Sequence, residues 1–392
     1  MTPDDNDRVE IDQTALAFAE WQLAGITPPD IPALRAYRLS RLQEQIWKHD
    51  CAGLLLFDLL NIRYATDCTN MQLWIAHNPA RAVFVPLEGK MILWDFHNCE
   101  HLSGHLPLIG ELRGGASFFY FETGDQTAKA AKDFAKQIID VMAKHAGANK
   151  RLAVDRIEHV GYAALCDLGV TVLEGQVLTE HARSIKNDNE LNAMRCAIHA
   201  CEASIDEMRA VMRPGLSENE LWAVLHAGNI KRDDEWIETR ILASGPRTNP
   251  WFQECGPRLM QAGDLMAFDT DLVGTYGYCC DISRTWIIGY AAPNDRQKHL
   301  YQTAYDHVMT NIGLIEAGMS FADVTRVSHR LPEMFRPLRY GGCFEVGMTL
   351  CVEAYIGAVG GHDGVKLEEQ VLITDSGAVP LSTYRYEAAF LD

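Results

Sequence analysis

Three features that would indicate a membrane, secreted or nucleic-acid-binding protein are missing from this sequence of 392 residues. No stretch approaches the run of about 18 apolar residues that a membrane-spanning helix needs. The N-terminal segment, MTPDDNDRVEIDQ, is acidic and contains no apolar run, so we expect no secretory signal. Basic residues are scarce: 35 Lys and Arg stand against 53 Asp and Glu, and the net charge of −18 disfavours nucleic acid or an anionic membrane as a partner.

The 11 cysteines form no recognisable framework, because their number is odd and no CxxC pair occurs. Cys279 and Cys280 are adjacent in the sequence, and adjacent cysteines rarely bridge. We therefore expect reduced thiols in a cytoplasmic protein. Hydrophobic residues make up 47% of the chain, which is enough for a large core, and the length favours two domains.

Residues 1–185 alternate between helical and strand-like patterns, which predicts an α/β domain. Helices are expected at 31–48 and 127–145, because apolar residues recur there at helical spacing. Strands are expected at 53–58, 81–87, 90–96, 151–156 and 170–175.

Residues 186–392 begin with helices and then change to strands. A long helix is predicted from Asp188 to the Pro214–Gly215 pair, and Ser217 with Glu220 has the capping-box pattern of the next helix. Later strands are expected in the segments RILASG, DLMAFDTDLVG, YCCDISRTWIIG, MTLCVEAYIG and VKLEEQVLIT.

Carboxylates on these predicted strands are the strongest chemical signal. Asp269 and Asp271 are two residues apart, so their side chains share one face of a strand. The GTYG turn at 274–277 predicts a hairpin that brings Asp281 nearly opposite Asp271. Acids grouped in this way require a cation, and hard oxygen donors suit one or two divalent metal ions.

Two more acids interrupt apolar strands, Glu353 in TLCVEAYIG and Glu368 in VKLEEQVLIT. A lone acid inside an apolar strand is costly, which favours a functional role. Glu369 points to the opposite face and is expected to be solvated. The alternative is that these acids pair with Arg or Lys on a solvated sheet face.

At this point the chain resembles a known family. The segments FDTDLVGTYGYCCDISRTWIIG, GMTLCVEAYIG and GVKLEEQVLIT are similar to the metal-binding strands of the creatinase/prolidase/methionine-aminopeptidase superfamily. NIRYATDC at 61–68 and ARSIKNDNELNAMR at 182–195 resemble its N-terminal and linker segments. The resemblance implies an α+β protein with a creatinase-like α/β domain (1–185) followed by a pita-bread metal-binding domain (186–392).

The resemblance also implies a homodimer and a divalent transition metal centre, with two ions expected. Iron is favoured, and manganese, cobalt or zinc are alternatives, because oxygen-rich sites accept all of them. The implied metal ligands are Asp269, Asp271, Asp281, Glu353 and Glu368.

Within the superfamily, the chain is most similar to the bacterial dimethylsulfoniopropionate (DMSP) lyases of the DddP type. The peptidases place a substrate-binding histidine after an SG turn, whereas ASGPRTNPWFQE at 243–254 has Trp251 and no histidine. DMSP is a small zwitterion whose sulfonium group can lie over aromatic rings. Trp251, Tyr278 and Tyr340 are the candidate substrate-binding residues, although each is also compatible with simple core packing.

A second departure concerns a histidine. The superfamily supplies a metal-binding histidine from a loop before the GMT strand, but no histidine lies between His329 and His362 here. The DMSP lyases carry a longer segment at this point, with that histidine and an aspartate proposed as base. We therefore expect the catalytic base in a segment that is absent near Gly341. Either the segment is truly deleted, or the numbering passes over a loop.

The resemblance implies an elimination reaction. A base removes the proton alpha to the substrate carboxylate, dimethyl sulfide leaves from the beta carbon, and acrylate remains. Two alternatives stay open: a metallo-hydrolase of the aminopeptidase, prolidase or creatinase type, or a non-catalytic pita-bread relative if the segment is truly deleted.

Overall fold

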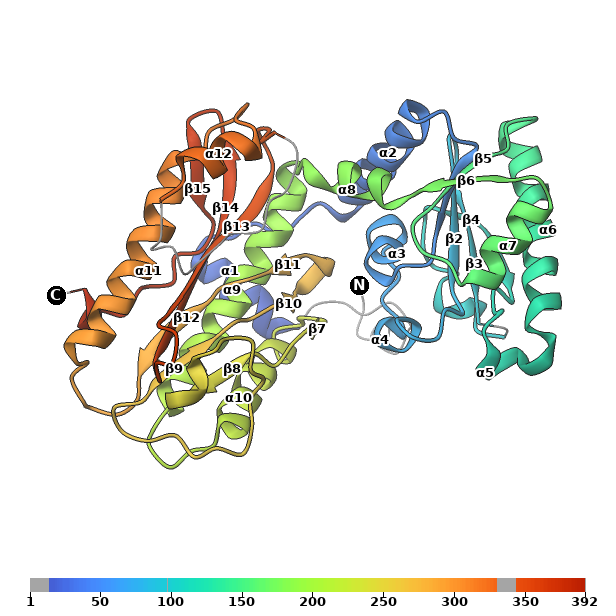
Figure 1. The fold of residues 1–392 in the computed structure, drawn as a ribbon. Helices are drawn as coiled ribbons and strands as arrows, with labels where there is room; N and C mark the ends of the chain where they lie inside the picture. Colours follow the sequence, from blue (N-terminus) through green and yellow to red (C-terminus); the bar gives the residue numbers. More distant parts are fainter. Residues whose placement is uncertain (1–13, 97, 330–342, 392) are drawn as a thin grey trace. The chain divides into compact units, whose positions relative to one another are not determined.

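We describe the protein from a computed structural model, which places residues 14–96, 98–329 and 343–391 (Figure 1). These residues form two compact units. The N-terminal unit is Asp30–Ser184, and the C-terminal unit begins at Ile185 and includes residues 14–29. Tyr340 and the junction near Gly341 lie outside the described residues. Within the described ranges, no helix combines the length and the apolar content needed to cross a membrane.

The N-terminal unit is built on a six-stranded sheet with the strand order β4-β3-β2-β1-β5-β6. The strands are β1 (Gly53–Leu56), β2 (Ala82–Pro86), β3 (Met91–Asp95), β4 (Ile109–Gly114), β5 (Arg151–Val154) and β6 (Thr171–Glu174). The helices are α2 (Ile31–Lys48), α3 (Leu59–Thr66), α4 (Gln72–Ile75), η2 (Glu100–Leu102), α5 (Tyr120–Thr123), η3 (Gly124–Gln126), α6 (Thr127–Ala146), α7 (His159–Asp167) and α8 (Gln176–Ser184).

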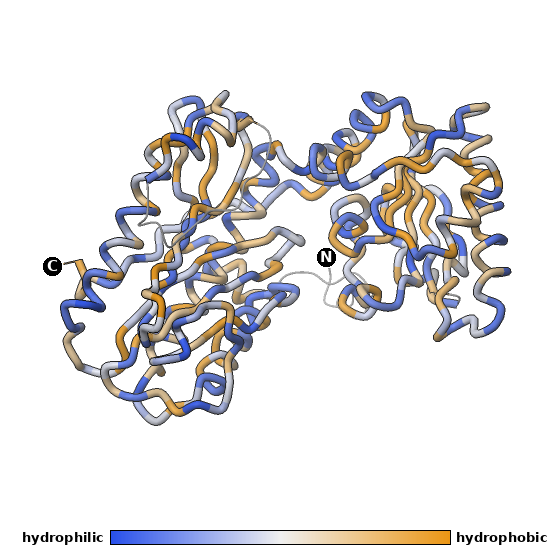
Figure 2. Tube along the Cα trace, viewed as in Figure 1, coloured by the Kyte–Doolittle hydropathy of each residue, from blue (hydrophilic) through white to orange (hydrophobic). Residues whose placement is uncertain are grey.

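Helices cover both faces of this sheet, because its strands are apolar on both sides. Along β1, Leu55 packs in the core formed with α6 and α7, whereas Leu54 and Leu56 pack in the core formed with α2, α3 and α8. Figure 2 shows the apolar residues concentrated along these strands.

The sequence patterns located the predicted helices and strands of this unit but missed β4. Its sequence, IGELRG, carries two charges and two glycines, and its residues are only partly buried. β4 lies at the edge of the sheet beside β3, where a strand needs little apolar character.

The C-terminal unit contains three small sheets and the longer helices. Its strands are β7 (Trp236–Ile237), β8 (Leu242–Ser244), β9 (Leu265–Phe268), β10 (Leu272–Val273), β11 (Cys279–Cys280), β12 (Arg284–Ile287), β13 (Thr349–Gly357), β14 (Gly364–Thr374) and β15 (Gly377–Pro380). Its helices are α1 (Ala15–Ala24), α9 (Asp188–Val211), α10 (Glu218–Ile230), η4 (Gly245–Thr248), η5 (Thr275–Gly277), α11 (Asp295–Leu314), α12 (Phe321–Val327) and η6 (Ala388–Phe390).

Capping boxes fix where the helices of this unit begin. Ser217 and Glu220 cap α10 reciprocally, as the sequence pattern predicted, and Asn187 and Glu190 cap α9 in the same way. α11 packs along the sheet of β13, β14 and β15, with which it shares a hydrophobic core (Figure 1).

The predicted hairpin around GTYG is present in two pieces. β9 pairs with β12, and β10 pairs with β11, with Leu272 opposite Cys280. β14 lies beside this hairpin: the Glu368 amide donates to the Ser283 carbonyl (3.2 Å), and the Lys366 amide donates to Thr285 Oγ1 (3.0 Å). The hairpin and β14 together position the candidate site.

Candidate metal centre

Each predicted acid sits on or directly beside a strand of the C-terminal unit. Asp269 follows β9, and Asp281 follows β11. Asp271 precedes β10, and its amide donates to Asp281 Oδ1 (3.2 Å), which is the near-opposite placement expected from the turn. β13 and β14 pair in antiparallel fashion with Glu353 directly opposite Glu368.

The structure brings all five predicted acids together. Their ligand atoms form overlapping triads, and within each triad the atoms lie within 4.8 Å of one another. The triads are Asp269–Asp271–Asp281, Asp269–Glu353–Glu368 and Asp281–Cys351–Glu368. Because the triads share members, the acids make one continuous centre.

A lysine that the sequence analysis overlooked lies inside this centre. Lys366 is 2% exposed, and its Nζ atom lies 2.6 Å from Glu353 Oε2, 2.8 Å from Asp269 Oδ2 and 2.9 Å from Glu368 Oε2. Its position, two residues before Glu368 on the same face of β14, was the signal that could have identified it. The alternative considered from the sequence, that these acids pair with Arg or Lys, is therefore correct for part of the site.

One ammonium group does not neutralise this centre. Burial, followed by the nearby Glu368 and Asp269 carboxylates, raises the pKa of Asp281 well above its usual range. Burial raises the pKa of Glu368 to about 7. Burial alone would lower the pKa of Lys366, but Glu368, Asp269 and Glu353 raise it well above its ordinary value. The acids therefore retain an unmet demand for positive charge, which a divalent ion fits.

Hydroxyl groups hold the carboxylates in place. Ser283 Oγ lies 2.6 Å from Asp269 Oδ1 and 2.7 Å from Glu368 Oε2, so its one proton serves either oxygen. Thr239 Oγ1 donates to Asp271 Oδ2 (2.7 Å). Such supporting hydrogen bonds orient metal ligands in proteins.

Two glutamates differ from expectation in their burial. The Glu353 side chain is 59% exposed, because only Val352, Ala354 and the other even-numbered residues of β13 face the core. Glu369, expected to be solvated, is 3% exposed and forms an ion pair with the buried Arg284. Glu369 lies on the face of β14 that packs in the core with α11, so it is covered there.

The structure places the candidate aromatic residues differently from one another. Trp251 is buried and stacks on Tyr355, with ring centroids 5.9 Å apart, and its ring centroid lies 6.0 Å from Lys366 Nζ. Trp251 thus borders the acids. Tyr278 is buried, and its hydroxyl donates to Glu190 Oε1 (2.8 Å) at the start of α9. Tyr340 lies outside the described residues, as does the junction expected to lack the base.

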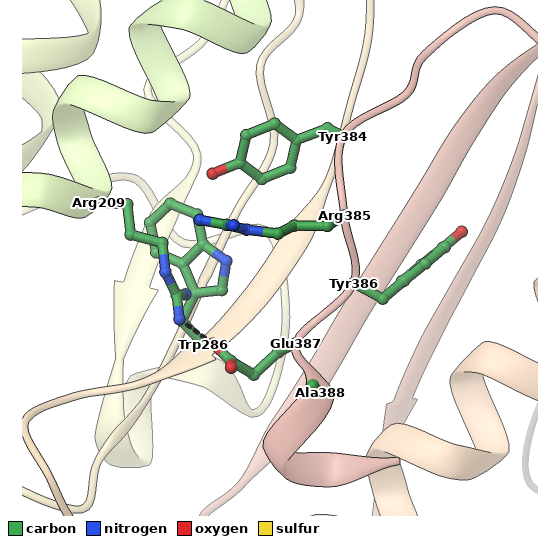
Figure 3. Close-up of a pocket in the computed structure, with 7 residues that line it drawn as sticks. All are labelled: Arg209, Trp286, Tyr384, Arg385, Tyr386, Glu387 and Ala388. Atoms are coloured by element: carbon green, nitrogen blue, oxygen red, sulfur yellow. Dashed lines mark hydrogen bonds and ion pairs between the residues drawn. The ribbon is translucent and has the colours of Figure 1, made fainter.

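A separate hollow of about 240 Å³ lies between α9, β12 and the C-terminal segment (Figure 3). Its lining residues bind one another: Arg209 forms an ion pair with Glu387, and the Arg209 guanidinium lies 4.7 Å from the centroid of Trp286. This hollow contains no cluster of potential metal ligands, and we interpret it as the seam where the C-terminal segment crosses α9.

Comparison with known proteins identifies the fold. Residues 192–341 match the model of metallopeptidase family M24. An Xaa-Pro dipeptidase from Bacillus anthracis superposes with a TM-score of 0.70, at 21% identity, over 89% of this chain and 98% of its own. A prolidase from Thermococcus sibiricus superposes with a TM-score of 0.71, at 19% identity, over 90% of this chain and 98% of its own. The predicted combination of a creatinase-like α/β domain and a pita-bread metal-binding domain is confirmed.

Two relatives are much more similar in sequence. The dimethylsulfoniopropionate lyase DddP of Roseovarius nubinhibens is 47% identical over all of this chain and 95% of its own length. The DddP of Roseobacter denitrificans is 43% identical over all of this chain and 94% of its own length. Both alignments run over 422 positions, so at least 30 positions have no residue in this 392-residue chain. By these similarities, the chain belongs to the family of dimethylsulfoniopropionate lyase DddP.

Proposed function

We propose that this protein is a metal-dependent carbon–sulfur lyase that cleaves DMSP to dimethyl sulfide and acrylate. The observation that carries this proposal is the 47% identity to a DMSP lyase over the whole chain, together with five acids gathered at one centre. The metallopeptidase family match, over residues 192–341, supports divalent metal chemistry at the strands that carry Asp269, Asp271 and Asp281.

The proposed ligands of this centre are Asp269, Asp271, Asp281, Glu353 and Glu368. Their hard oxygen atoms suit two divalent ions, with iron favoured and manganese, cobalt or zinc as alternatives. Ions held there supply Lewis-acid withdrawal of the negative charge that develops on the substrate carboxylate. The protein's part is to fix these oxygens, and Ser283 and Thr239 do so through hydrogen bonds.

The substrate is a small zwitterion, and two parts of the centre match its two charges. Its carboxylate is proposed to face the metal ions, beside the Lys366 ammonium group. Its dimethylsulfonium group is proposed to lie against aromatic rings, where a cation is favoured. Trp251 is the best-supported of these rings because it borders the acids, whereas Tyr278 and Tyr340 remain predictions.

The proposed reaction breaks two bonds and forms a carbon–carbon double bond. A base takes the proton alpha to the carboxylate, and that electron pair forms the double bond of acrylate. The carbon–sulfur bond breaks, and its electrons leave with dimethyl sulfide. The carboxylates beside Lys366 are poor candidates for this base, because their charge is committed to cations. We assign this base to no residue named here and expect it in a segment that is absent near Gly341.

A metallo-hydrolase is the second candidate, because the prolidase and Xaa-Pro dipeptidase structures share this fold. A third candidate, a non-catalytic relative, is favoured by the 30 or more alignment positions that this chain lacks. We further propose a cytoplasmic homodimer, which agrees with the acidic, reduced-thiol character of the sequence and with the family resemblance.

Product analysis separates these candidates. Metal-loaded protein is supplied in parallel with DMSP and with Xaa-Pro dipeptides, and dimethyl sulfide, acrylate and free proline are measured. A matched variant carries the additional segment of the Roseovarius nubinhibens relative at the junction near Gly341. Dimethyl sulfide and acrylate in equal amounts from the unaltered chain support the proposal. Free proline supports the hydrolase, and dimethyl sulfide from the extended variant alone identifies this chain as a non-catalytic relative.

A further inference from the structure

The odd-numbered face of β13 carries a thiol beside the acid centre. Val352, Ala354 and Ile356 point into the hydrophobic core, so Cys351, Glu353 and Tyr355 lie on the opposite face. Cys351 is a free cysteine and is partly buried. Its Sγ atom lies within 4.8 Å of ligand oxygens of both Asp281 and Glu368, which themselves lie within that distance of each other.

We propose that Cys351 is a further metal ligand, which binds through its sulfur to the ion held by Asp281 and Glu368. This inference rests on the metal centre of the proposed function and adds a ligand to it. A thiolate is a strong donor for transition metals, and metal sites with three protein ligands are common in enzymes. Here the three side chains come from β13, from β14 and from the residue after β11.

The distribution of charge in the centre favours a metal ion beside Asp281 and Cys351. The Lys366 ammonium group already contacts Asp269, Glu353 and Glu368 at 2.6 to 2.9 Å. Asp281 belongs to the triad with Cys351, whereas the three ion pairs of Lys366 join the lysine to the other acids named above. A metal ion at the Asp281 end therefore supplies positive charge where the lysine does not.

The composition of the ligand set gives a second reason. The sequence has no histidine between His329 and His362, so it offers no imidazole from the segment before β13. Cys351 provides a non-oxygen donor from β13 itself. When the sulfur coordinates the ion, the thiol proton passes to solvent, as it does for other cysteine ligands.

A sulfur ligand changes which metals the site prefers. A thiolate ligand increases the preference for zinc and cobalt over manganese, which a site of carboxylates alone shows less strongly. The competing interpretation is that the thiol packs against the carboxylates without contacting the ion. These two interpretations differ in their spectroscopy, which is independent of catalysis.

The test replaces the metal with cobalt(II) and records the absorption spectrum of the intact chain. The unaltered protein is expected to show a sulfur-to-cobalt charge-transfer band in the near ultraviolet. Cys351→Ser should abolish the band and weaken zinc binding by at least about tenfold, with a smaller effect on manganese. Cys166→Ser, at an exposed cysteine of the N-terminal unit, is the matched control and should leave the band unchanged.

The outcomes separate this inference from the proposed function. A cobalt-loaded protein without the band, or a band that survives in Cys351→Ser, overturns the ligand assignment even if DMSP is cleaved. A band that disappears in Cys351→Ser supports the assignment even if DMSP is not cleaved. Failure of the protein to bind cobalt overturns the assignment together with the metal centre. Cys351→Ala provides a second variant if the serine variant does not fold.

Discussion

Lys366 Nζ lies 2.9 Å from Glu368 Oε2, so a strand of this protein carries a buried cation two residues before a buried acid. The same ammonium group also contacts Asp269 and Glu353. It therefore neutralises part of the acid centre when no metal ion is bound. The stability of the metal-free protein should depend on it.

Lys366→Met is predicted to destabilise the metal-free protein by about 3–5 kcal/mol, because it leaves buried carboxylates without their partner. The loss should be smaller when divalent metal is present, since the ion then supplies the missing charge. Urea unfolding with chelator and with metal measures both values. Lys231→Met, which removes an exposed ion pair with Glu207, should cost less than about 1 kcal/mol. A metal-free Lys366→Met protein as stable as this control would contradict the account.

Glu368→Gln and Glu369→Gln should change different properties, metal affinity and stability respectively, although the two residues are adjacent. Glu368 belongs to the acid centre, so its variant should lose metal affinity by about 100-fold or more. This loss is larger than the loss of affinity that is typical when a residue that only hydrogen-bonds to a ligand is replaced. Glu369 pairs with Arg284 on the other face, so its variant should keep the metal and lose about 3–5 kcal/mol of stability. Elemental analysis after dialysis, together with urea unfolding, measures both. Equal metal loss in the two variants would argue against the assignment of faces.

The metal-free protein is predicted to lose stability as the pH rises. The pKa of Glu368 is raised in the folded state from 4.5 to about 7, so the folded protein binds its proton more tightly than the unfolded chain does. The resulting stabilisation is complete below about pH 4.5 and is lost as the pH rises through about 7. Thermal unfolding in chelator from pH 5 to pH 8 measures this change. Added divalent metal should reverse it near pH 8, and a melting temperature that rises with pH in chelator would contradict the prediction.

Trp251→Ala is predicted to raise KM for DMSP by about 2- to 30-fold with a smaller effect on kcat, because a cation over an aromatic ring is stabilised by about 0.5–2 kcal/mol. Trp251→Phe keeps a ring and should lie between the alanine variant and the unaltered protein. Steady-state kinetics with DMSP measures both constants. An unchanged KM in the alanine variant would remove Trp251 from the substrate site.

The sequence predicted most of the acid centre because its geometry follows local rules. The alternation of side chains and a tight turn were enough to bring Asp271 and Asp281 together, and the pairing of two long strands sets Glu353 opposite Glu368. The role of Lys366 could not be predicted in the same way. From the sequence alone, a lysine in a strand is expected to face solvent. Lys366 is instead surrounded by acids because folding brings β14 beside Asp269, which is about 100 positions away in the sequence.

The wrong expectations about the burial of Glu369, Glu353 and β4 have the same cause. Glu369 was expected in solvent, but it lies on the face of β14 that packs in the core with α11, and Arg284 is buried beside it. Glu353 was expected inside an apolar strand, yet its side chain is 59% exposed. β4 was missed because an edge strand needs no apolar pattern. In each case the elements that surround the strand, rather than its own sequence, determine the burial.

The most direct test of the central claim is the release of dimethyl sulfide from DMSP by the metal-loaded chain, compared with Asp281→Asn and with chelator-treated protein. We predict release that is linear in enzyme concentration, falls by about 100-fold or more in Asp281→Asn, and returns when metal is restored to the chelated protein. Absence of dimethyl sulfide from metal-loaded protein, or release that is unaffected by chelation and by Asp281→Asn, would contradict it.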